Sequence, residues 1–239
     1  MSIVHFIRHG QGTLDGGDYD NLSKLGQTQA RQLGDMFVER GLRFGHTLCG
    51  GQRRHNQTAE IVAGCYHSAG IEFPEIEIDT RFNEIDSYNI IENVIQAFVK
   101  ADNKFARLAQ KSREALKNNL PEKFDLFDEL YIQLMKAWIS GRFPEIEAIS
   151  WDDFCSTVLS AQSNLRAFAD DEHIAVFTSA NPIGVFIKEA LSLSNDRALE
   201  VMDNIYNTST STFVISHGRL SLKHMNVTSH LRADQITRK

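Results

Sequence analysis

The stretch IVHFIRHG, residues 3–10, decides the fold class of this 239-residue chain. Its apolar part predicts a strand over residues 3–7 that is buried on both faces of a sheet. Arg8 and His9 stand where that strand ends, and a polar, glycine-rich stretch over residues 11–21 follows them. In α/β proteins, ligands bind beyond the carboxyl ends of the strands. We therefore expect Arg8 and His9 at the edge of a sheet that carries a binding site.

Outward from this stretch, the pattern alternates between helices and strands. A first helix is expected from Ser23, as N-cap, to Gly41. The later elements expected are strands at 47–51, 76–78 and 174–177, helices at 57–66, 151–168 and 182–193, and a closing hairpin at 211–215 and 220–225. This order predicts a three-layer α/β/α sandwich with a mostly parallel central sheet.

The middle of the chain has a helical pattern only, with apolar residues such as Leu130, Leu134 and Trp138 at helical spacing. We interpret about 88–145 as a helical insertion within a single domain that spans residues 1–239. Its helices could shape a substrate pocket or simply pack against one another, and both interpretations stay open.

Composition and charge exclude several classes of protein. Hydrophobic residues make up 42% and charged residues 23% of the chain, as in ordinary globular domains. The formal net charge of −6 argues against nucleic acid or an anionic membrane as the main partner. The first apolar run ends too early for a signal peptide, no run is long enough to span a membrane, and three widely spaced cysteines favour free thiols. These features predict a cytoplasmic protein.

Polar residues follow three of the expected strands. Arg8 and His9 follow the first strand, residues 50–54 follow the second, and residues 178–181 follow the strand at 174–177. A strand end that meets solvent would explain one such group. Three groups at the same edge of a parallel sheet instead favour a shared site.

The motifs in these groups resemble those of the histidine phosphatase superfamily, also called the phosphoglycerate mutase-like family. Arg8-His9-Gly10 matches the family's opening motif and is followed by Gln11 and by LSKLGQTQA at residues 22–30. Residues 54–59, RHNQTA, match the second motif, although Gly50-Gly51 replaces the usual Ser-Pro before it. The resemblance covers both ends of the chain and leaves its helical middle unmatched.

The resemblance implies phosphoryl transfer with His9 as nucleophile, and the residue types suit that chemistry. A neutral imidazole can attack phosphorus when its other ring nitrogen is fixed by a hydrogen bond. The planar forks of Arg8 and Arg54 can each hold two phosphate oxygens. Glu84 is the expected proton donor to the leaving oxygen, with Asp86 as the fallback. The mechanism requires no metal and no cofactor.

One position departs from the family pattern. The family carries a second histidine after the fourth strand, which donates to the phosphoryl oxygens, and Ser179 stands in its place here. Ser179 and the amide of Ala180 are then the expected phosphate contacts, while Gln11, His55 and Asn181 are pocket candidates. A serine cannot become cationic, and loss of one donor at a developing oxyanion costs on the order of a hundredfold in rate.

A second Ser-His-Gly sequence, residues 216–218, could be mistaken for the missing motif. A helix should follow the true motif, as it does after Pro182. After Gly218, in contrast, Leu220 and Leu222 alternate with polar residues as in a strand. We therefore interpret His217-Gly218 as a hairpin turn.

The sequence thus predicts a phosphomonoester hydrolase whose substrate is a phosphorylated small molecule or a phosphoprotein. The alternative is a degenerate family member that binds a phosphorylated ligand or partner without turnover, because Ser179 replaces a histidine. A mutase is less well supported, since nothing specifies a pocket that excludes water. Cysteine-based phosphatase chemistry does not fit the spacing. It needs five residues between the cysteine and an arginine, and the position that this spacing gives after Cys49 is occupied by His55.

Overall fold

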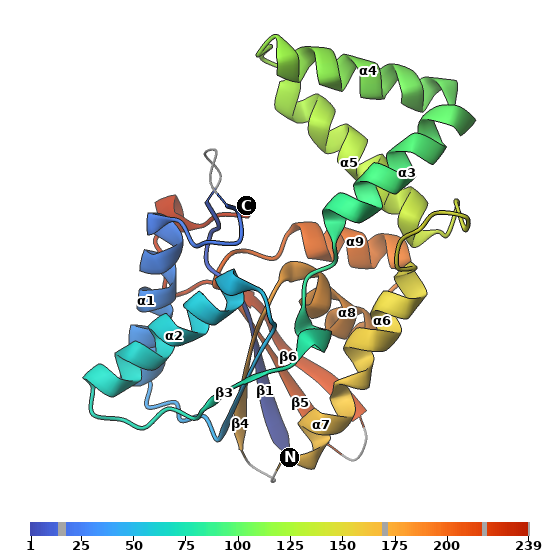
Figure 1. Ribbon diagram of the computed structural model, residues 1–239. Coiled ribbons are helices and arrows are strands. Elements are labelled where there is room, and N and C mark those ends of the chain that lie inside the picture. Colours follow the sequence, from blue (N-terminus) through green and yellow to red (C-terminus); the bar gives the residue numbers. More distant parts are fainter. Residues whose placement is uncertain (14–17, 169–171, 217–218, 239) are drawn as a thin grey trace. The chain divides into compact units, whose positions relative to one another are not determined.

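The computed structural model of the chain describes residues 1–13, 18–168, 172–216 and 219–238 (Figure 1). They form two compact units, of which Met1–Glu84 with Thr157–Lys239 is the first and Ile85–Ser156 the second. The predicted turn at His217-Gly218 lies outside the described residues. No helix among the described residues is long and apolar enough to cross a membrane.

The first unit contains a six-stranded sheet in the order β3-β2-β4-β1-β5-β6. The strands are β1 (Ser2–Arg8), β2 (His46–Cys49), β3 (Ile76–Ile78), β4 (His173–Thr178), β5 (Thr210–Ser216) and β6 (Arg219–Val227). Neighbours from β3 to β1 pair in parallel, whereas β5 pairs antiparallel with both β1 and β6. The predicted α/β class with a mostly parallel sheet is confirmed.

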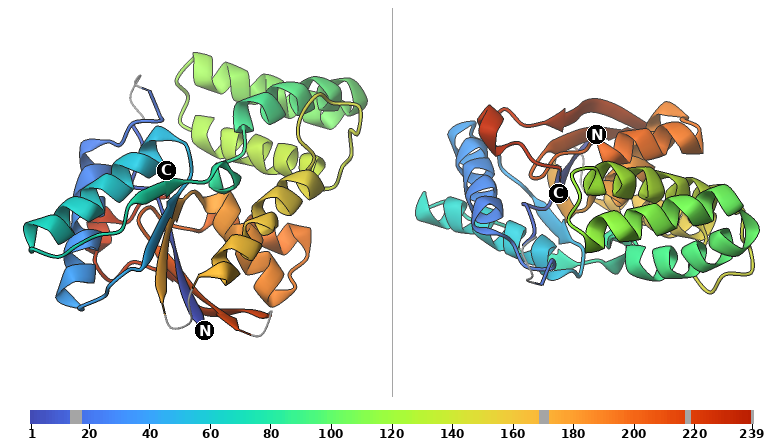
Figure 2. Two further views of the ribbon diagram at one scale, coloured as in Figure 1. Left: turned by 60° about the horizontal axis from the view of Figure 1, so that its bottom comes forward. Right: turned by 90° about the horizontal axis from the view of Figure 1, so that it is seen from above.

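Helices cover both faces of this sheet (Figures 1 and 2). The helices α1 (Lys24–Glu39) and α2 (Arg53–Ser68) lie on one face, and α7 (Gln162–Ala167) and α8 (Ala180–Leu191) on the other. Adjacent residues of β1 point to opposite faces. Ile7 joins the apolar cluster beneath α1 and α2, while the Phe6 ring lies 4.4 Å from that of Phe186 in α8.

Two helix boundaries of the sequence prediction were wrong. The helix α2 begins at Arg53 rather than at residue 57, because the carboxylate of Asp20 accepts from the amides of Arg53 (3.0 Å) and Arg54 (3.4 Å). The helix expected over 151–168 is two helices, α6 (Trp151–Ser160) and α7, which are separated at the buried Ala161. The Ala161 amide bonds the Val158 carbonyl at 3.2 Å, a tightened turn that ends α6.

A helix after α8 was missed by the sequence analysis. Ser192 adopts a left-handed conformation (φ 52°) and ends α8. Ser194 then caps α9 (Asn195–Asp203), since its side chain accepts from the Arg197 amide at 3.4 Å. A serine such as Ser194 before a charged first turn is a known signal for the start of a helix, but the residues that follow it have weak apolar periodicity.

The second unit is helical, as its periodicity predicts. Its helices are α3 (Ser87–Ala101), α4 (Asn103–Lys117) and α5 (Lys123–Ile139). Asp102 ends α3, and its side chain caps α4 by accepting from the Lys104 and Phe105 amides. The rings of Phe98 and Phe105 stack at 3.8 Å, which joins α3 to α4.

Candidate functional site

The register of the parallel strands brings three loops together. Arg8 pairs with Thr178 at the ends of β1 and β4, and Cys49 of β2 pairs with Phe177. Beyond these pairs the ladder continues, since the His9 amide donates to the Thr178 carbonyl at 2.9 Å and the Gly50 amide to the Phe177 carbonyl at 3.0 Å. The residues that follow β1, β2 and β4 therefore meet at one edge of the sheet.

His9 lies at this edge with only 2% of its surface exposed. Its Nδ1 lies 2.7 Å from the Gly10 carbonyl, and because a carbonyl can only accept, Nδ1 carries the proton. The Nε2 atom then presents its lone pair. The amide of Gly10 donates to Thr58 Oγ1 (3.1 Å) and the Asn207 side chain donates to the His9 carbonyl (3.1 Å), which fixes the loop on both sides.

The surroundings of His9 keep its ring neutral. Burial, followed by the positive charges of Arg8 and Arg54, holds the pKa of His9 well below its ordinary value. The Nε of Arg54 donates to His9 Nε2 at 3.2 Å, so it is aimed at the atom that would act as the nucleophile. A neutral imidazole with an oriented Nε2 is the form that can attack phosphorus.

Both arginines of the prediction converge on this edge. Arg54 is 5% exposed, and its Nη1 and Nη2 donate to Asp20 Oδ1 (2.8 Å) and Gln52 Oε1 (3.2 Å). Arg8 is 7% exposed and donates from Nη1 to the Ile205 carbonyl. The buried Nε of Arg8 has no hydrogen-bond partner among the described residues. Two largely buried guanidiniums therefore lie beside one imidazole, and Asp20 is the ion-pair partner of Arg54.

The loop that carries His9 packs on the first turn of α1 without room for side chains. A Cβ on Gly10 would lie 2.5 Å from the Gly26 carbonyl oxygen, and a Cβ on Gly26 would lie 2.1 Å from that of Gln11. Ser23 caps the same turn and donates from Oγ to Gln11 Oε1 at 2.8 Å. This close approach explains the glycine of LSKLG, and the serine of the same sequence holds the Gln11 side chain at the helix start.

Ser179 and His55 form a buried pair beside His9. Ser179 Oγ lies 2.6 Å from His55 Nε2, and both residues are fully buried. The His55 and His9 rings are 5.6 Å apart. Ala180 begins α8, where the first amides of a helix have no partner within the helix, and Asn181 follows it in a half-buried position.

Glu84 is linked to Arg54 through Gln52. The Glu84 amide donates to Gln52 Oε1 at 2.9 Å, the same oxygen that accepts from Arg54. Burial lowers the pKa of Arg8, and the charges of Tyr19 and Glu84 oppose this shift, which indicates that Glu84 is a neighbour of Arg8. Asp86, the fallback acid, uses its carboxylate to cap α3 by accepting from the Asn89 amide at 3.1 Å.

The thiol of Cys49 is unsuited to nucleophilic chemistry. Burial raises its pKa to about 12, which disfavours the reactive thiolate. Among the described residues, no group of three or more His, Cys, Asp or Glu side chains is arranged to hold a metal ion.

Sequence analysis did not identify Asp20, Gln52, Tyr19 or Asn207. The Tyr19 ring lies 5.3 Å from Arg54 Cζ and 6.5 Å from the His9 ring. Tyr19 and Asp20 belong to the polar loop after β1, and a loop that follows a strand end carries function more often than its composition suggests. Asn207 is distant in the sequence, and no local pattern marks it.

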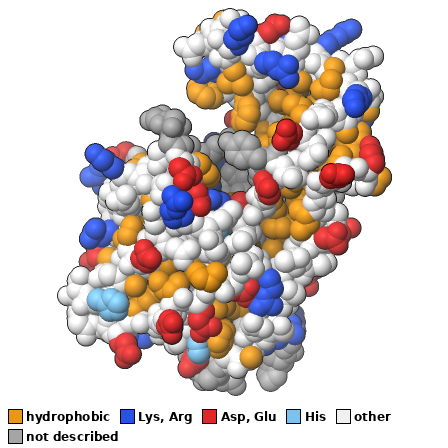
Figure 3. Space-filling view, viewed as in Figure 1, with side chains coloured by type: hydrophobic (Ala, Val, Ile, Leu, Met, Phe, Trp, Pro, Cys, Tyr) orange, Lys and Arg blue, Asp and Glu red, His pale blue; other side chains and the backbone are white. Residues whose placement is uncertain are grey.

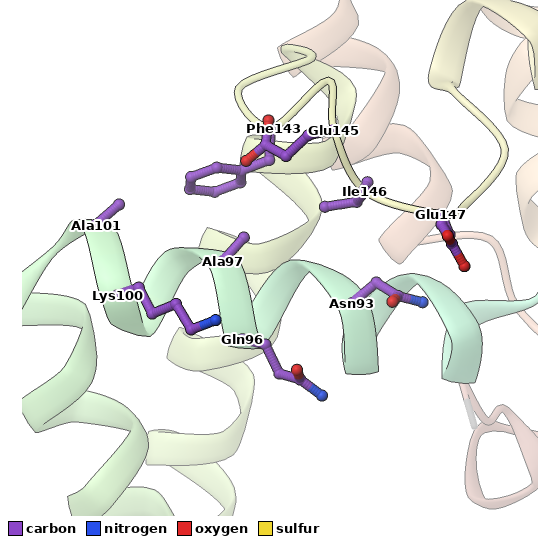
Figure 4. Close-up of a pocket in the computed structure, with 9 residues that line it drawn as sticks. All are labelled: Asn93, Gln96, Ala97, Lys100, Ala101, Phe143, Glu145, Ile146 and Glu147. Carbon is purple, nitrogen blue, oxygen red and sulfur yellow. The ribbon is translucent and has the colours of Figure 1, made fainter.

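A cavity of about 520 Å³ lies in the second unit, between α3 and the segment after α5 (Figure 4). Its lining residues are Asn93, Gln96, Ala97, Lys100, Ala101, Phe143, Glu145, Ile146 and Glu147. None of the predicted site residues lines it. On the face drawn in Figure 3, acidic and basic side chains of the described residues are interspersed.

Comparison with known proteins identifies the class to which this fold and site belong. A sequence profile of the histidine phosphatase superfamily (branch 1) matches residues 4–125, so the chain belongs to that superfamily. No curated protein sequence matches the chain.

Solved structures share the fold at low sequence identity. Bacillus stearothermophilus YhfR is 17% identical with a TM-score of 0.67, and the match covers 96% of this chain and 99% of that one. A mutant phosphoserine phosphatase from Entamoeba histolytica, in complex with phosphoserine, is 16% identical with a TM-score of 0.64 over 97% and 100% of the two chains. A mycobacterial glucosyl-3-phosphoglycerate phosphatase with inorganic phosphate is 18% identical with a TM-score of 0.59 over 96% and 99%.

Proposed function

We propose that this protein is a phosphomonoester hydrolase that works through a phosphohistidine intermediate on His9. Membership of the histidine phosphatase superfamily and the phosphatases among its structural relatives support a phosphatase-type function. The observation that carries the proposal is the orientation of the His9 ring, whose Nδ1 is held by the Gly10 carbonyl while Nε2 faces Arg54.

The first step of the proposed reaction forms a bond between His9 Nε2 and phosphorus and breaks the phosphorus–oxygen ester bond. Arg8 and Arg54 would neutralise the phosphoryl oxygens, and positioning and charge supply most of the catalysis in such transfers. The unpartnered Nε of Arg8 is one donor suited to this role. Arg54 would move its Nε–H from His9 Nε2 to a phosphoryl oxygen, which frees the lone pair for attack.

Glu84 is the proposed general acid. It would give its proton to the leaving oxygen, and its carboxylate would then take a proton from the water that attacks phosphorus in the phosphohistidine. That second step releases inorganic phosphate and restores the neutral His9. The contact of its amide with Gln52, which also holds Arg54, supports this assignment.

The proposed substrate is a phosphorylated small molecule or a phosphoprotein. Phosphoserine is bound in one structural relative, and another acts on glucosyl-3-phosphoglycerate, so phosphorylated amino and sugar acids are suitable first substrates. We also propose that the protein acts in the cytoplasm and requires no metal.

A nucleophile variant tests this function. His9→Ala should lower the rate of phosphate ester hydrolysis by at least about a thousandfold, because no other group replaces the attacking nitrogen. Quenching the parent protein in alkaline detergent during turnover of a phosphorus-labelled ester should trap label on His9. His67→Ala, on the exposed end of the same site helix α2, is the matched control. Equal hydrolysis by His9→Ala and the parent would refute the assignment.

The alternative is a protein that binds a phosphorylated ligand without turnover, which Ser179 at the expected place of the second histidine favours. A parent protein that binds inorganic phosphate but turns over no ester in a broad panel would support this alternative. Measurable parental turnover that depends on His9 would exclude it.

A further inference from the structure

His55 is a buried histidine beside the proposed nucleophile. Its ring is fully buried, 5.6 Å from the ring of His9, and its Nε2 lies 2.6 Å from Ser179 Oγ. Burial of an imidazole costs free energy, because its polar atoms lose their hydration. Here the ring lies near His9 and contacts Ser179, the residue that follows β4, at the edge where the proposed phosphoryl group would bind.

We infer that His55 and Ser179 act together as the second phosphate donor of this site, with His55 as a positioning residue behind the serine. The inference rests on the proposed phosphate site. In this role His55 would donate from Nε2 to Ser179 Oγ, which lies 2.6 Å away, and the serine hydroxyl hydrogen would then be directed to a phosphoryl oxygen. The serine thus acquires a fixed direction and a neighbouring imidazole, which a serine alone lacks.

The backbone beside His55 is shaped for its ring. A Cβ on Gly50 would lie only 2.3 Å from His55 Nδ1, so any larger residue at position 50 would collide with the imidazole. The two departures from the family pattern, glycine at position 50 and serine at position 179, are therefore neighbours of the same ring. Both make room for an imidazole that reaches the phosphate region from α2 instead of from the end of β4.

The charges around the pair suit a donor that responds to phosphate. Burial and the nearby Arg54 hold the pKa of His55 well below its ordinary value, so the ring is neutral before an anion enters. A phosphate dianion offsets the charge of Arg54 and favours protonation of the ring. His9 and Arg54 are the other titratable groups that face His55.

The first experiment measures the affinity for inorganic phosphate by calorimetry, which does not depend on turnover. Ser179→Ala should weaken binding about tenfold, as expected for loss of one hydrogen bond to a charged group. Ser112→Ala removes another fully buried serine, in the second unit, and should leave the affinity unchanged. Unchanged affinity in Ser179→Ala would overturn the inference.

The second experiment exchanges the two side chains. The single variants His55→Ala and Ser179→Ala should each lower kcat on the order of a hundredfold, and the double alanine variant should lose little more, because the pair acts as a unit. The exchange variant His55→Ala with Ser179→His should recover most of the loss by returning an imidazole to the end of β4. The single variant Ser179→His should not reach the activity of the exchange variant, since the new ring and the His55 ring would compete for one buried space.

These outcomes separate the pair from simple packing and from the wider proposal. Additive losses in the double variant, or an exchange variant no better than His55→Ala, would show that His55 is structural. If His55→Ala fails to fold, the phosphate affinity of Ser179→Ala still decides. If the parent turns over no ester but Ser179→Ala still weakens phosphate binding, the pair is supported while hydrolysis is refuted.

Discussion

At the scale of single residues, Gln52 connects the two functions proposed for the site. Its Oε1 accepts from both Arg54 Nη2 and the Glu84 amide, so one side-chain oxygen contacts both the guanidinium proposed to bind phosphate and the residue proposed as the acid. Asp20 holds the other arm of Arg54 at 2.8 Å. The guanidinium is therefore oriented before any ligand arrives, which lowers the entropic cost of binding.

We predict that Gln52→Ala lowers kcat/KM by about tenfold, because one hydrogen bond to a charged group contributes about 1.5–3 kcal/mol and Asp20 still holds Arg54. Steady-state kinetics with a phosphate ester measures the change. Gln110→Ala, on an exposed position of α4, is the control. Full activity in Gln52→Ala would mean that Asp20 alone orients Arg54.

At the scale of elements, α1 supports the His9 loop through Gly26, α2 carries Arg54 in its first turn, and the two helices pack on each other. Gly34 of α1 lies at their contact, where an added Cβ would be 2.7 Å from Cys65 Sγ and 3.2 Å from the Cα of Val62. Gly64 of α2 has no atom within 4 Å of such a Cβ. The two glycines therefore offer a comparison between a position inside the helix contact and an exposed position outside it.

We predict opposite signs for the two alanine substitutions. Gly34→Ala should lower the free energy of unfolding by about 1–3 kcal/mol through overpacking, whereas Gly64→Ala should raise it by about 0.5–1 kcal/mol through helix propensity. Urea denaturation of both variants measures the difference. A free energy of unfolding that Gly34→Ala leaves unchanged or raises would show that the helix contact adjusts to the extra methyl group.

At the scale of the whole molecule, buried histidines should make the protein sensitive to mild acid. Burial lowers the pKa of His5 to about 3 and that of His230 to about 4. The pKa values of His9, His55 and His173 are also lowered, with burial as the largest cause. In the unfolded chain these rings titrate near their ordinary pKa of about 6.5.

We predict that the free energy of unfolding falls as the pH drops from about 6.5 toward 4, because in this window the unfolded chain binds protons that the folded chain excludes. Each histidine contributes up to about 1.4 kcal/mol per pH unit. Urea denaturation at several pH values tests this. His230→Gln should flatten the dependence and His67→Gln should not. Stability that is constant between pH 7 and 5 would contradict the prediction.

Much of this molecule could be predicted from local sequence. The apolar run before Arg8, the serine cap of α1 and the alternation around residues 210–227 each depend on contacts between near neighbours in the chain, so their periodicity predicts their structure. The strand-end motifs also predicted which loops would meet, because parallel register follows from the β-α alternation. Arg8, His9 and Arg54 were predicted to share this edge in this way, and the roles proposed for them come from the resemblance of their motifs to the family.

Tertiary structure alone decided what surrounds these residues. Asp20 reaches Arg54, Asn207 reaches the His9 carbonyl and Ser179 reaches His55 across long separations in the chain, and no periodicity records such contacts. The sequence by itself determined the fold class, because the β-α alternation follows from local patterns, and its strand-end motifs predicted His9 as the nucleophile. The partners that orient the nucleophile and its arginines are set by packing, since side chains distant in sequence become neighbours only when the sheet and its helices assemble.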